Sequence, residues 1–265
     1  MAMAHVSELL LVVEHLSRSF DGVDAVRDVS FAVAPGEIVA MIGPNGAGKT
    51  TCFNLIHGEL RPDAGNIRFD RRSLVDLPTH EIAHRGIGRT FQMPATFASM
   101  TVREAVALSI AAHEQHDARL FDVALADRAY PVDQHLSRLH ISDIADAHCG
   151  TLAYGEAKRL EIALALGNAP RLLLMDEPTA GMDQAWRRRL MARVIELARP
   201  DNVSILFTEH DMDIVFCFAE RIIVLDRGEI IAHGPADRIR NDPRVQAAYL
   251  GEVAGNRRAP HPDEP

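Results

Sequence analysis

Residues 43–50 constrain the fold of this 265-residue chain more than any other feature. They read Gly43, Pro44, Asn45, Gly46, Ala47, Gly48, Lys49 and Thr50, which is the P-loop pattern G-x-x-x-x-G-K-[ST]. An apolar run rich in β-favouring residues precedes them at 37–42, and apolar residues recur at helical spacing after them at 51–56. These flanks favour a strand–loop–helix P-loop over a chance glycine turn.

The chemistry of such a loop suits a nucleoside triphosphate. Its glycines let successive N–H groups point inward, and the partial positive charge at the start of the following helix favours phosphate. We expect Lys49 to reach the β- and γ-phosphates and the Thr50 hydroxyl to ligate Mg²⁺. Thr51 completes the predicted nucleotide site.

The composition of the chain limits the kinds of partner and cofactor that we expect. The net charge of -9, from 28 basic and 37 acidic residues, argues against nucleic acid as the main partner. The three cysteines form no C-x-x-C pair, which predicts a reduced intracellular protein without structural disulfides or zinc. No apolar run reaches the roughly 18–20 residues that a membrane span needs, so we expect a soluble protein.

Before the P-loop, the apolar run at 9–13 predicts an edge strand, and residues 10–31 predict a hairpin that turns at Asp21 and Gly22. Phe20 could stack on a base or be an ordinary sheet residue, and its own position favours neither. Beyond the P-loop, the pattern predicts a strand at 66–70, a short helix at 78–85 and a β run at 86–92.

The second half of the chain alternates helical and strand patterns. Residues 101–152 and 160–167 read as mostly helical, whereas 172–177 read as a strand buried on both faces, as in the centre of a parallel sheet. A helix at 184–199, a strand at 203–208, a helix at 212–219 and a strand at 222–226 follow. Repeated βα units predict an α/β fold with a mainly parallel sheet, and residues 252–265 predict a disordered tail.

Asp176 and Glu177 end the predicted central strand, at the edge where open α/β sheets bind ligands. Downstream of a P-loop, Asp176 is expected to hold Mg²⁺ beside the γ-phosphate, and Glu177 to orient the attacking water or accept its proton. The alternative is an acidic helix cap after a strand. The conjunction with the P-loop favours catalysis.

Six separated motifs, in order, resemble the ATP-binding subunits of ABC transporters from about residue 10 to residue 251. They are the P-loop at 43–50, Gln92, a signature-like stretch (Leu152, Ala153, Tyr154, Gly155 and Glu156), the strand at 172–176 with Glu177, Ala180 to Asp183, and His210. The resemblance implies a P-loop NTPase core in a domain at 9–251, with an antiparallel β subdomain and a helical subdomain inserted at about 93–165.

The resemblance also assigns roles. Gln92 would sense Mg²⁺ and the γ-phosphate and link the site to the membrane partner, and His210 would hold the catalytic geometry around Glu177. Phe20 would take the adenine-stacking position. Asp183 and the signature stretch would face a second ATP-binding subunit, so that the active unit is a dimer with ATP sandwiched between its subunits.

The signature departs from the general pattern Leu-Ser-Gly-Gly-Gln at Ala153, Tyr154 and Glu156. Ala153 lacks the serine hydroxyl that normally touches the γ-phosphate, and losing one hydrogen bond to a charged group costs about 1.5–3 kcal/mol where nothing compensates. Gly155 and the following helix start remain. The residues that this chain contributes to its own ATP site are complete, which predicts a working ATPase.

Finer features resemble the branched-chain amino-acid importer group, with its urea and amide relatives. They are residues 88–92, 100–104, 160–163 and the ending at 242–251. The resemblance implies two permeases contacted through the loop at 93–103, a second ATP-binding subunit, a periplasmic binding protein that delivers the solute, and a place at the cytoplasmic face of the inner membrane. A lipopolysaccharide-export ATPase, a soluble scaffold ATPase of iron–sulfur assembly and a regulatory nucleotide-binding protein are the alternatives. The cargo cannot be chosen from these residues.

Overall fold

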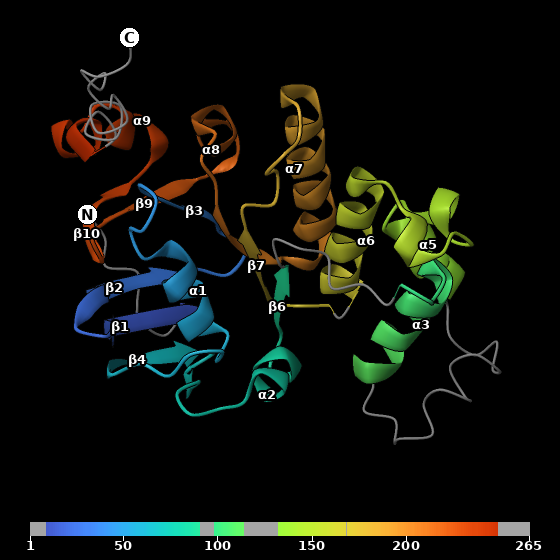
Figure 1. The fold of residues 1–265 in the computed structure, drawn as a ribbon, viewed down its shortest axis with the longest axis horizontal. Helices are drawn as coiled ribbons and strands as arrows, with labels where there is room; N and C mark the ends of the chain where they lie inside the picture. The colour runs from blue at the N-terminus through green and yellow to red at the C-terminus, as the bar shows by residue number, and fades with distance from the viewer. Residues whose placement is uncertain (1–8, 91–97, 114–131, 168, 249–265) are drawn as a thin grey trace, which may run out of the picture.

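The computed structural model describes residues 9–90, 98–113, 132–167 and 169–248. Two sheets and three groups of helices organise them. Figure 1 shows the smaller sheet at one end of the long axis and the helices α3, α5 and α6 at the other. The larger sheet runs from β10 and β9, which lie above the smaller sheet in this view, to β7 and β6, which lie toward α6.

The smaller sheet is antiparallel, with strand order β2-β1-β4-β5. Its strands are β1 (Leu11–Phe20), β2 (Val23–Val33), β4 (Ala64–Phe69) and β5 (Arg72–Ser73). The predicted hairpin is confirmed, because β1 and β2 pair around a turn at Asp21 and Gly22, both with positive φ. The prediction of an edge strand at 9–13 is wrong: β1 is an inner strand, because β4 returns to pair on its second side.

The larger sheet has the order β10-β9-β3-β8-β7-β6, with β9 to β6 parallel and β10 antiparallel. Its strands are β3 (Ile38–Ile42), β6 (Ile87–Thr90), β7 (Leu172–Asp176), β8 (Ser204–Thr208), β9 (Arg221–Asp226) and β10 (Glu229–Gly234). The predicted mainly parallel sheet and the inner position of β7 are confirmed. The sequence reading did not find β10.

Helices cover both faces of the larger sheet. They are α1 (Lys49–Ile56), α2 (Thr79–His84), α7 (Gln184–Ala198), α8 (Met212–Phe218) and α9 (Ala236–Arg240), with a 3₁₀ turn at Arg199–Asp201 after α7. Alternate residues of each parallel strand enter different cores. In β3, Val39 and Met41 pack with α1 and the smaller sheet, whereas Ile38, Ala40 and Ile42 pack with α7 and α8.

A third core joins the helices at the other end of the molecule. These are α3 (Val102–His113), α5 (Val132–Arg138) and α6 (Tyr154–Gly167), with 3₁₀ turns at Ser142–Ile144 and Cys149–Thr151. The helix expected from residue 160 begins earlier, at Tyr154. None of the helices in the described part of the chain combines the length and apolar character needed to cross a bilayer.

The carboxyl ends of the parallel strands lie along one edge of the sheet. At that edge β3 runs into the P-loop, β7 ends at Asp176 and β8 ends at Thr208. Segments far apart in the sequence therefore meet there. The predicted residues Gln92 and 93–97 and the predicted tail at 252–265 lie outside the described residues.

Candidate active site

The P-loop backbone has the shape of a phosphate cradle. Gly43, Gly46 and Gly48 all have positive φ, which side-chain-bearing residues adopt only with strain. At Gly43 a Cβ would lie 2.1 Å from the Leu225 carbonyl oxygen, and at Gly48 it would lie 2.3 Å from that of Ala25. Only glycine fits at these two positions, since the obstacles are backbone atoms.

Lys49 lies at the start of α1 with 6% of its surface exposed. Its ammonium donates hydrogen bonds to the carbonyl oxygens of Gly43 at 2.7 Å and Pro44 at 3.1 Å. The Nζ atom is thus held within the curl of the loop. Within the described residues no side chain caps the first turn of α1, whose preceding residue is Gly48. A helix start without a side-chain cap and a nearby ammonium suit an anion.

Hydrogen bonds from parts of the chain outside residues 43–50 hold the P-loop in place. The Gly228 N–H, in the β9–β10 turn, donates to the Ala47 carbonyl oxygen at 3.1 Å, and the Arg27 N–H donates to the Gly228 carbonyl oxygen at 2.8 Å. Strand β2 therefore reaches the P-loop through the turn that ends β9. This turn was not among the predicted elements of the site.

Asp176 and Glu177 are joined by a residue that the sequence reading missed. The buried Thr208 hydroxyl donates to Asp176 Oδ1 at 2.6 Å and accepts the Glu177 N–H at 2.9 Å. Asp176 and Thr208 are register partners of the parallel strands β7 and β8. Glu177 has φ 48°, a left-handed backbone that costs a non-glycine residue roughly 1–3 kcal/mol. The Thr208 contact helps to hold it there.

Glu177 and His210 are brought together as the resemblance implies. Glu177 Oε1 lies 2.7 Å from His210 Nε2, and the two side chains are 23% and 44% exposed. The carboxylate is thus oriented from one side and open to solvent on the other.

Glu209, a second residue missed from the sequence, fixes the turn after β7. It is buried, and its Oε1 accepts the Thr179 N–H at 2.9 Å and the Thr179 hydroxyl at 2.6 Å. The end of β8 is therefore tied to the residues after Glu177. A signal was present in the sequence, because a carboxylate and a threonine each follow an apolar strand.

The signature-like stretch begins α6. The Ala153 N–H donates to Glu156 Oε2 at 2.8 Å, which is half of a capping box. The Tyr154 hydroxyl donates to the Ala180 carbonyl oxygen at 2.9 Å, so this departure from the general pattern ties the signature to the turn before α7 within the chain. No atom of the described residues lies within 4 Å of where a Cβ on Gly155 would be.

Asp183 and Phe20, the residues expected to face a second subunit and a base, each make contacts within the chain. The Asp183 carboxylate caps α7 by accepting the N–H groups of Ala185 and Trp186 at 3.0 Å. Phe20 ends β1 with 39% of its surface exposed, and the Arg18 guanidinium lies 4.9 Å from its ring centroid. Both residues are accessible, and their roles toward a second subunit and a base stay predictions.

Arg89 connects β6 with α1 on the side of the site that leads toward Gln92. Its guanidinium donates to Asn54 Oδ1 at 2.7 Å and to Glu59 Oε1 at 3.1 Å, and burial lowers the pKa of Arg89. The Arg89 side chain is only 4% exposed, and its contacts fix the end of β6 just before the region outside the described residues.

The residues present fit a nucleotide and its Mg²⁺. A glycine cradle with no room for a side chain at Gly43 or Gly48, together with the ammonium of Lys49, suits phosphates. The Thr50 hydroxyl and the buried Asp176 carboxylate are hard oxygen donors of the kind that Mg²⁺ prefers. Among the described residues no group of three His, Cys, Asp or Glu side chains could hold a metal by itself.

Comparisons with known proteins agree with this geometry. Residues 26–180 match the family model described as "ABC transporter", and residues 229–255 match the one described as "Branched-chain amino acid ATP-binding cassette transporter". The chain is 40% identical over 257 residues to the high-affinity branched-chain amino acid transport ATP-binding protein LivG of Salmonella typhimurium, covering 94% of this chain and 100% of LivG.

Two further likenesses extend the comparison. The lipopolysaccharide export system ATP-binding protein LptB of Acidithiobacillus ferridurans is 35% identical over 243 residues, covering 92% of this chain and 97% of LptB. Among solved structures, the ADP conformation of MJ1267, an ATP-binding cassette of an ABC transporter, is 31% identical with a TM-score of 0.78. The match covers 92% of this chain and 99% of MJ1267.

Proposed function

The chain belongs to the ABC transporter family, and on that premise we propose that it hydrolyses ATP to drive the import of branched-chain amino acids. The main support for this class of transported solute is the match of residues 229–255 to the branched-chain family model. These residues lie outside the region matched by the general ABC model. The likeness to LivG supports it over the full length of that protein. A urea or amide cargo belongs to the same group of importers.

The P-loop from Gly43 to Thr50, with Thr51, would hold the triphosphate, and Phe20 would stack on the adenine. Lys49 would set its ammonium against the β- and γ-phosphates, a position that its contacts with the Gly43 and Pro44 carbonyl oxygens support. A bound Mg²⁺, held by Thr50, Gln92 and Asp176, would neutralise charge on the phosphate oxygens.

Glu177 is proposed as the residue that orients the attacking water or accepts its proton. Its carboxylate is partly open to solvent and is steered by His210 Nε2 at 2.7 Å. Water so placed attacks the γ-phosphate in line with the leaving oxygen, while Lys49 and His210 stabilise the developing negative charge.

The proposed partners follow from the family. A second ATP-binding subunit would face the signature residues (Leu152, Ala153, Tyr154, Gly155 and Glu156) and Asp183. Two permeases would contact the segment at 93–103, predicted as a loop, although its last two residues, Val102 and Arg103, begin α3 in the structure. This contact would hold the protein at the cytoplasmic face of the inner membrane, with a periplasmic binding protein acting indirectly. The missing hydroxyl at Ala153 is not replaced by Tyr154, whose hydroxyl is engaged with Ala180.

The proposed chemistry is tested with Glu177→Gln. We expect turnover to fall by roughly 10²–10⁴-fold, the usual contribution of a general base, with ATP binding kept. Glu220→Gln makes the same chemical change at an exposed position and should leave turnover unchanged. Lys49→Ala should weaken ATP binding itself. Near-normal turnover of the Glu177 variant, or unchanged affinity of the Lys49 variant, would remove that residue from its role.

The transport role is tested by recovering the ATP-bound Glu177→Gln protein from mildly solubilised native membranes and identifying its partners by mass spectrometry. Two multi-spanning proteins and a second, similar ATPase are the expected result. Partners of a lipopolysaccharide exporter would replace the importer assignment with that one. Recovery from the soluble fraction alone would favour a scaffold ATPase.

A further inference from the structure

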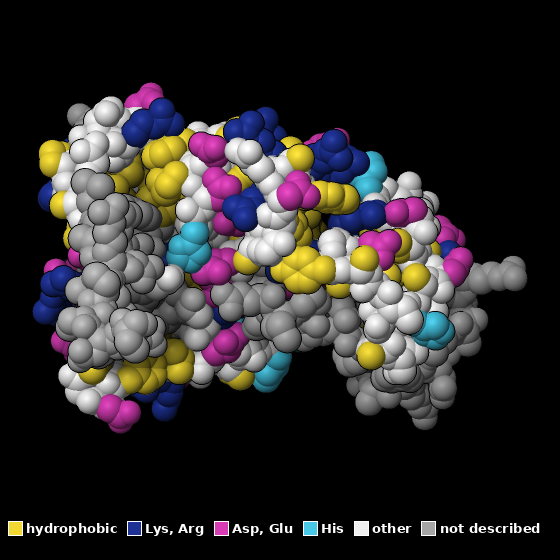
Figure 2. Space-filling view, turned by 45° about the horizontal axis from the view of Figure 1, so that its top comes forward, with side chains coloured by type: hydrophobic (Ala, Val, Ile, Leu, Met, Phe, Trp, Pro, Cys, Tyr) yellow, Lys and Arg dark blue, Asp and Glu magenta, His cyan; other side chains and the backbone are white. Residues whose placement is uncertain are grey.

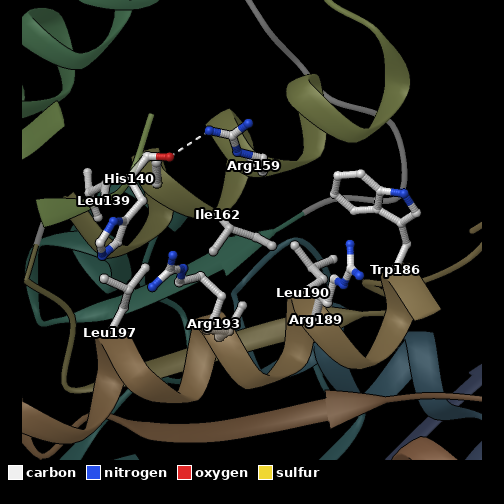
Figure 3. A pocket seen from close by; sticks show the side chains of 11 residues that line it. Leu139, His140, Arg159, Ile162, Trp186, Arg189, Leu190, Arg193 and Leu197 are labelled. Carbon is white, nitrogen blue, oxygen red and sulfur yellow. Dashed lines mark hydrogen bonds between the residues drawn. The ribbon is translucent and has the colours of Figure 1, made fainter. Parts of the chain in front are cut away.

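A groove lies between α6 and α7, and no residue of the P-loop lines it. Its cavity measures about 220 Å³, larger than the roughly 150 Å³ cavity that accommodates a benzene ring. Figure 3 shows Trp186 and Arg189 at one end, Arg193 and His140 at the other, and Ile162 and Leu190 between them. None of these residues has a place in the ATP site.

The floor of the groove is apolar. Ile162 of α6 and Leu190 of α7 are buried, as is Leu139 after α5. These side chains already belong to the second and third cores, so the floor is rigid rather than a loose surface patch. A rigid apolar floor of this size suits the hydrocarbon part of a small ligand.

The rim carries positive charge. The Arg159 guanidinium is paired with Asp143 at 2.6 Å, and that of Arg193 with Glu196 at 2.8 Å. Arg189 has no ion pair or hydrogen bond within the described part of the chain. The described side chains that line the groove include no carboxylate. Lys and Arg side chains gather on the surface over α6 and α7 (Figure 2). The groove therefore offers one uncompensated guanidinium above an apolar floor.

We infer that this groove binds a small apolar monocarboxylate, with its carboxylate on Arg189 and its hydrocarbon part on Ile162 and Leu190. A guanidinium pairs a carboxylate through two parallel hydrogen bonds, which fixes the orientation of the ligand. An ammonium group would meet arginines and no carboxylate in the groove. A 2-oxo acid is thus the preferred ligand over the amino acid with the same side chain.

The single tryptophan of the chain makes the site observable. Trp186 is 47% exposed and lines the groove, so tryptophan emission reports on this place alone. The probe is 4-methyl-2-oxopentanoate, and leucine is the comparison. Binding of labelled probe to the full chain is measured by equilibrium dialysis at constant salt, and Trp186 emission is recorded on the same samples.

We expect saturable binding of the probe, at least tenfold tighter than that of leucine, and a parallel change in Trp186 emission. Arg189→Gln should weaken binding about tenfold, the loss expected for a charge-assisted hydrogen bond. Arg188→Gln is the matched control, because Arg188 is exposed one residue earlier on α7 and does not line the groove. Absence of saturable binding would overturn the inference. So would binding that leucine matches, that leaves emission unchanged, or that the two variants weaken equally.

Discussion

Thr208 is the residue on which the geometry of the catalytic carboxylates depends most directly. Its hydroxyl joins the Asp176 carboxylate at 2.6 Å to the Glu177 N–H at 2.9 Å, and it is fully buried. Thr208→Val removes the hydroxyl while nearly preserving the volume. Both partners then lose a hydrogen bond in a place that water does not reach.

The cost follows from the two contacts. A hydrogen bond to a charged group contributes about 1.5–3 kcal/mol and a neutral one about 0.5–1.5 kcal/mol, so the free energy of unfolding should fall by about 2–4.5 kcal/mol. For a chain of this size each kcal/mol lowers the thermal midpoint by roughly 2–4 °C. Turnover should fall by about 10–100-fold, because the strained backbone of Glu177 loses one of its supports and the carboxylate shifts.

Thr208→Ser is the matched control, since it keeps the hydroxyl and loses one methyl group at a cost of about 1 kcal/mol. Urea denaturation gives the two free energies, and steady-state ATP hydrolysis gives turnover. If the valine variant proves as stable as the serine variant, or hydrolyses ATP at the wild-type rate, the hydroxyl does not organise the site and the reasoning fails.

A thiol reagent should label Cys217 quickly, because this side chain is exposed, and the other two cysteines only on unfolding. Burial raises the pKa of the Cys52 thiol to about 12 and also raises that of Cys149, so neither forms the reactive thiolate readily. Rapid labelling of two or three thiols would contradict these positions. Burial lowers the pKa of His57 below its usual 6.5, an effect that the Glu59 contact only partly opposes. The unfolded chain then binds a proton at His57 more readily than the folded chain does. The contribution of His57 to the free energy of unfolding is therefore fully present above about pH 6.5 and is lost as the pH drops toward the folded-state pKa. His57→Gln should flatten this fall in the thermal midpoint, and an unaltered slope would exclude His57 as its source.

The sequence by itself determined the nucleotide site and the family. A P-loop is contiguous, so the glycine conformations and the position of Lys49 are encoded within eight neighbouring residues. The same holds for the runs that became β3, β7 and β8, whose continuous apolar character reports burial on both faces. The pairing of Glu177 with His210 was implied only by family resemblance, and the structure places the two side chains in contact.

Only the tertiary structure decided which distant segments meet. Whether β1 is an edge or an inner strand depends on where β4 returns, and no local pattern contains that choice. Thr208 reaches Asp176 because β8 lies beside β7 in register, and Tyr154 reaches Ala180 because α6 begins beside the turn before α7. The groove of Arg189 and Ile162 likewise exists only once α6 and α7 pack together. Neighbouring residues determine short-range backbone geometry. The contacts between distant segments depend instead on strand order and helix packing, and sequences with the same local patterns could arrange these differently.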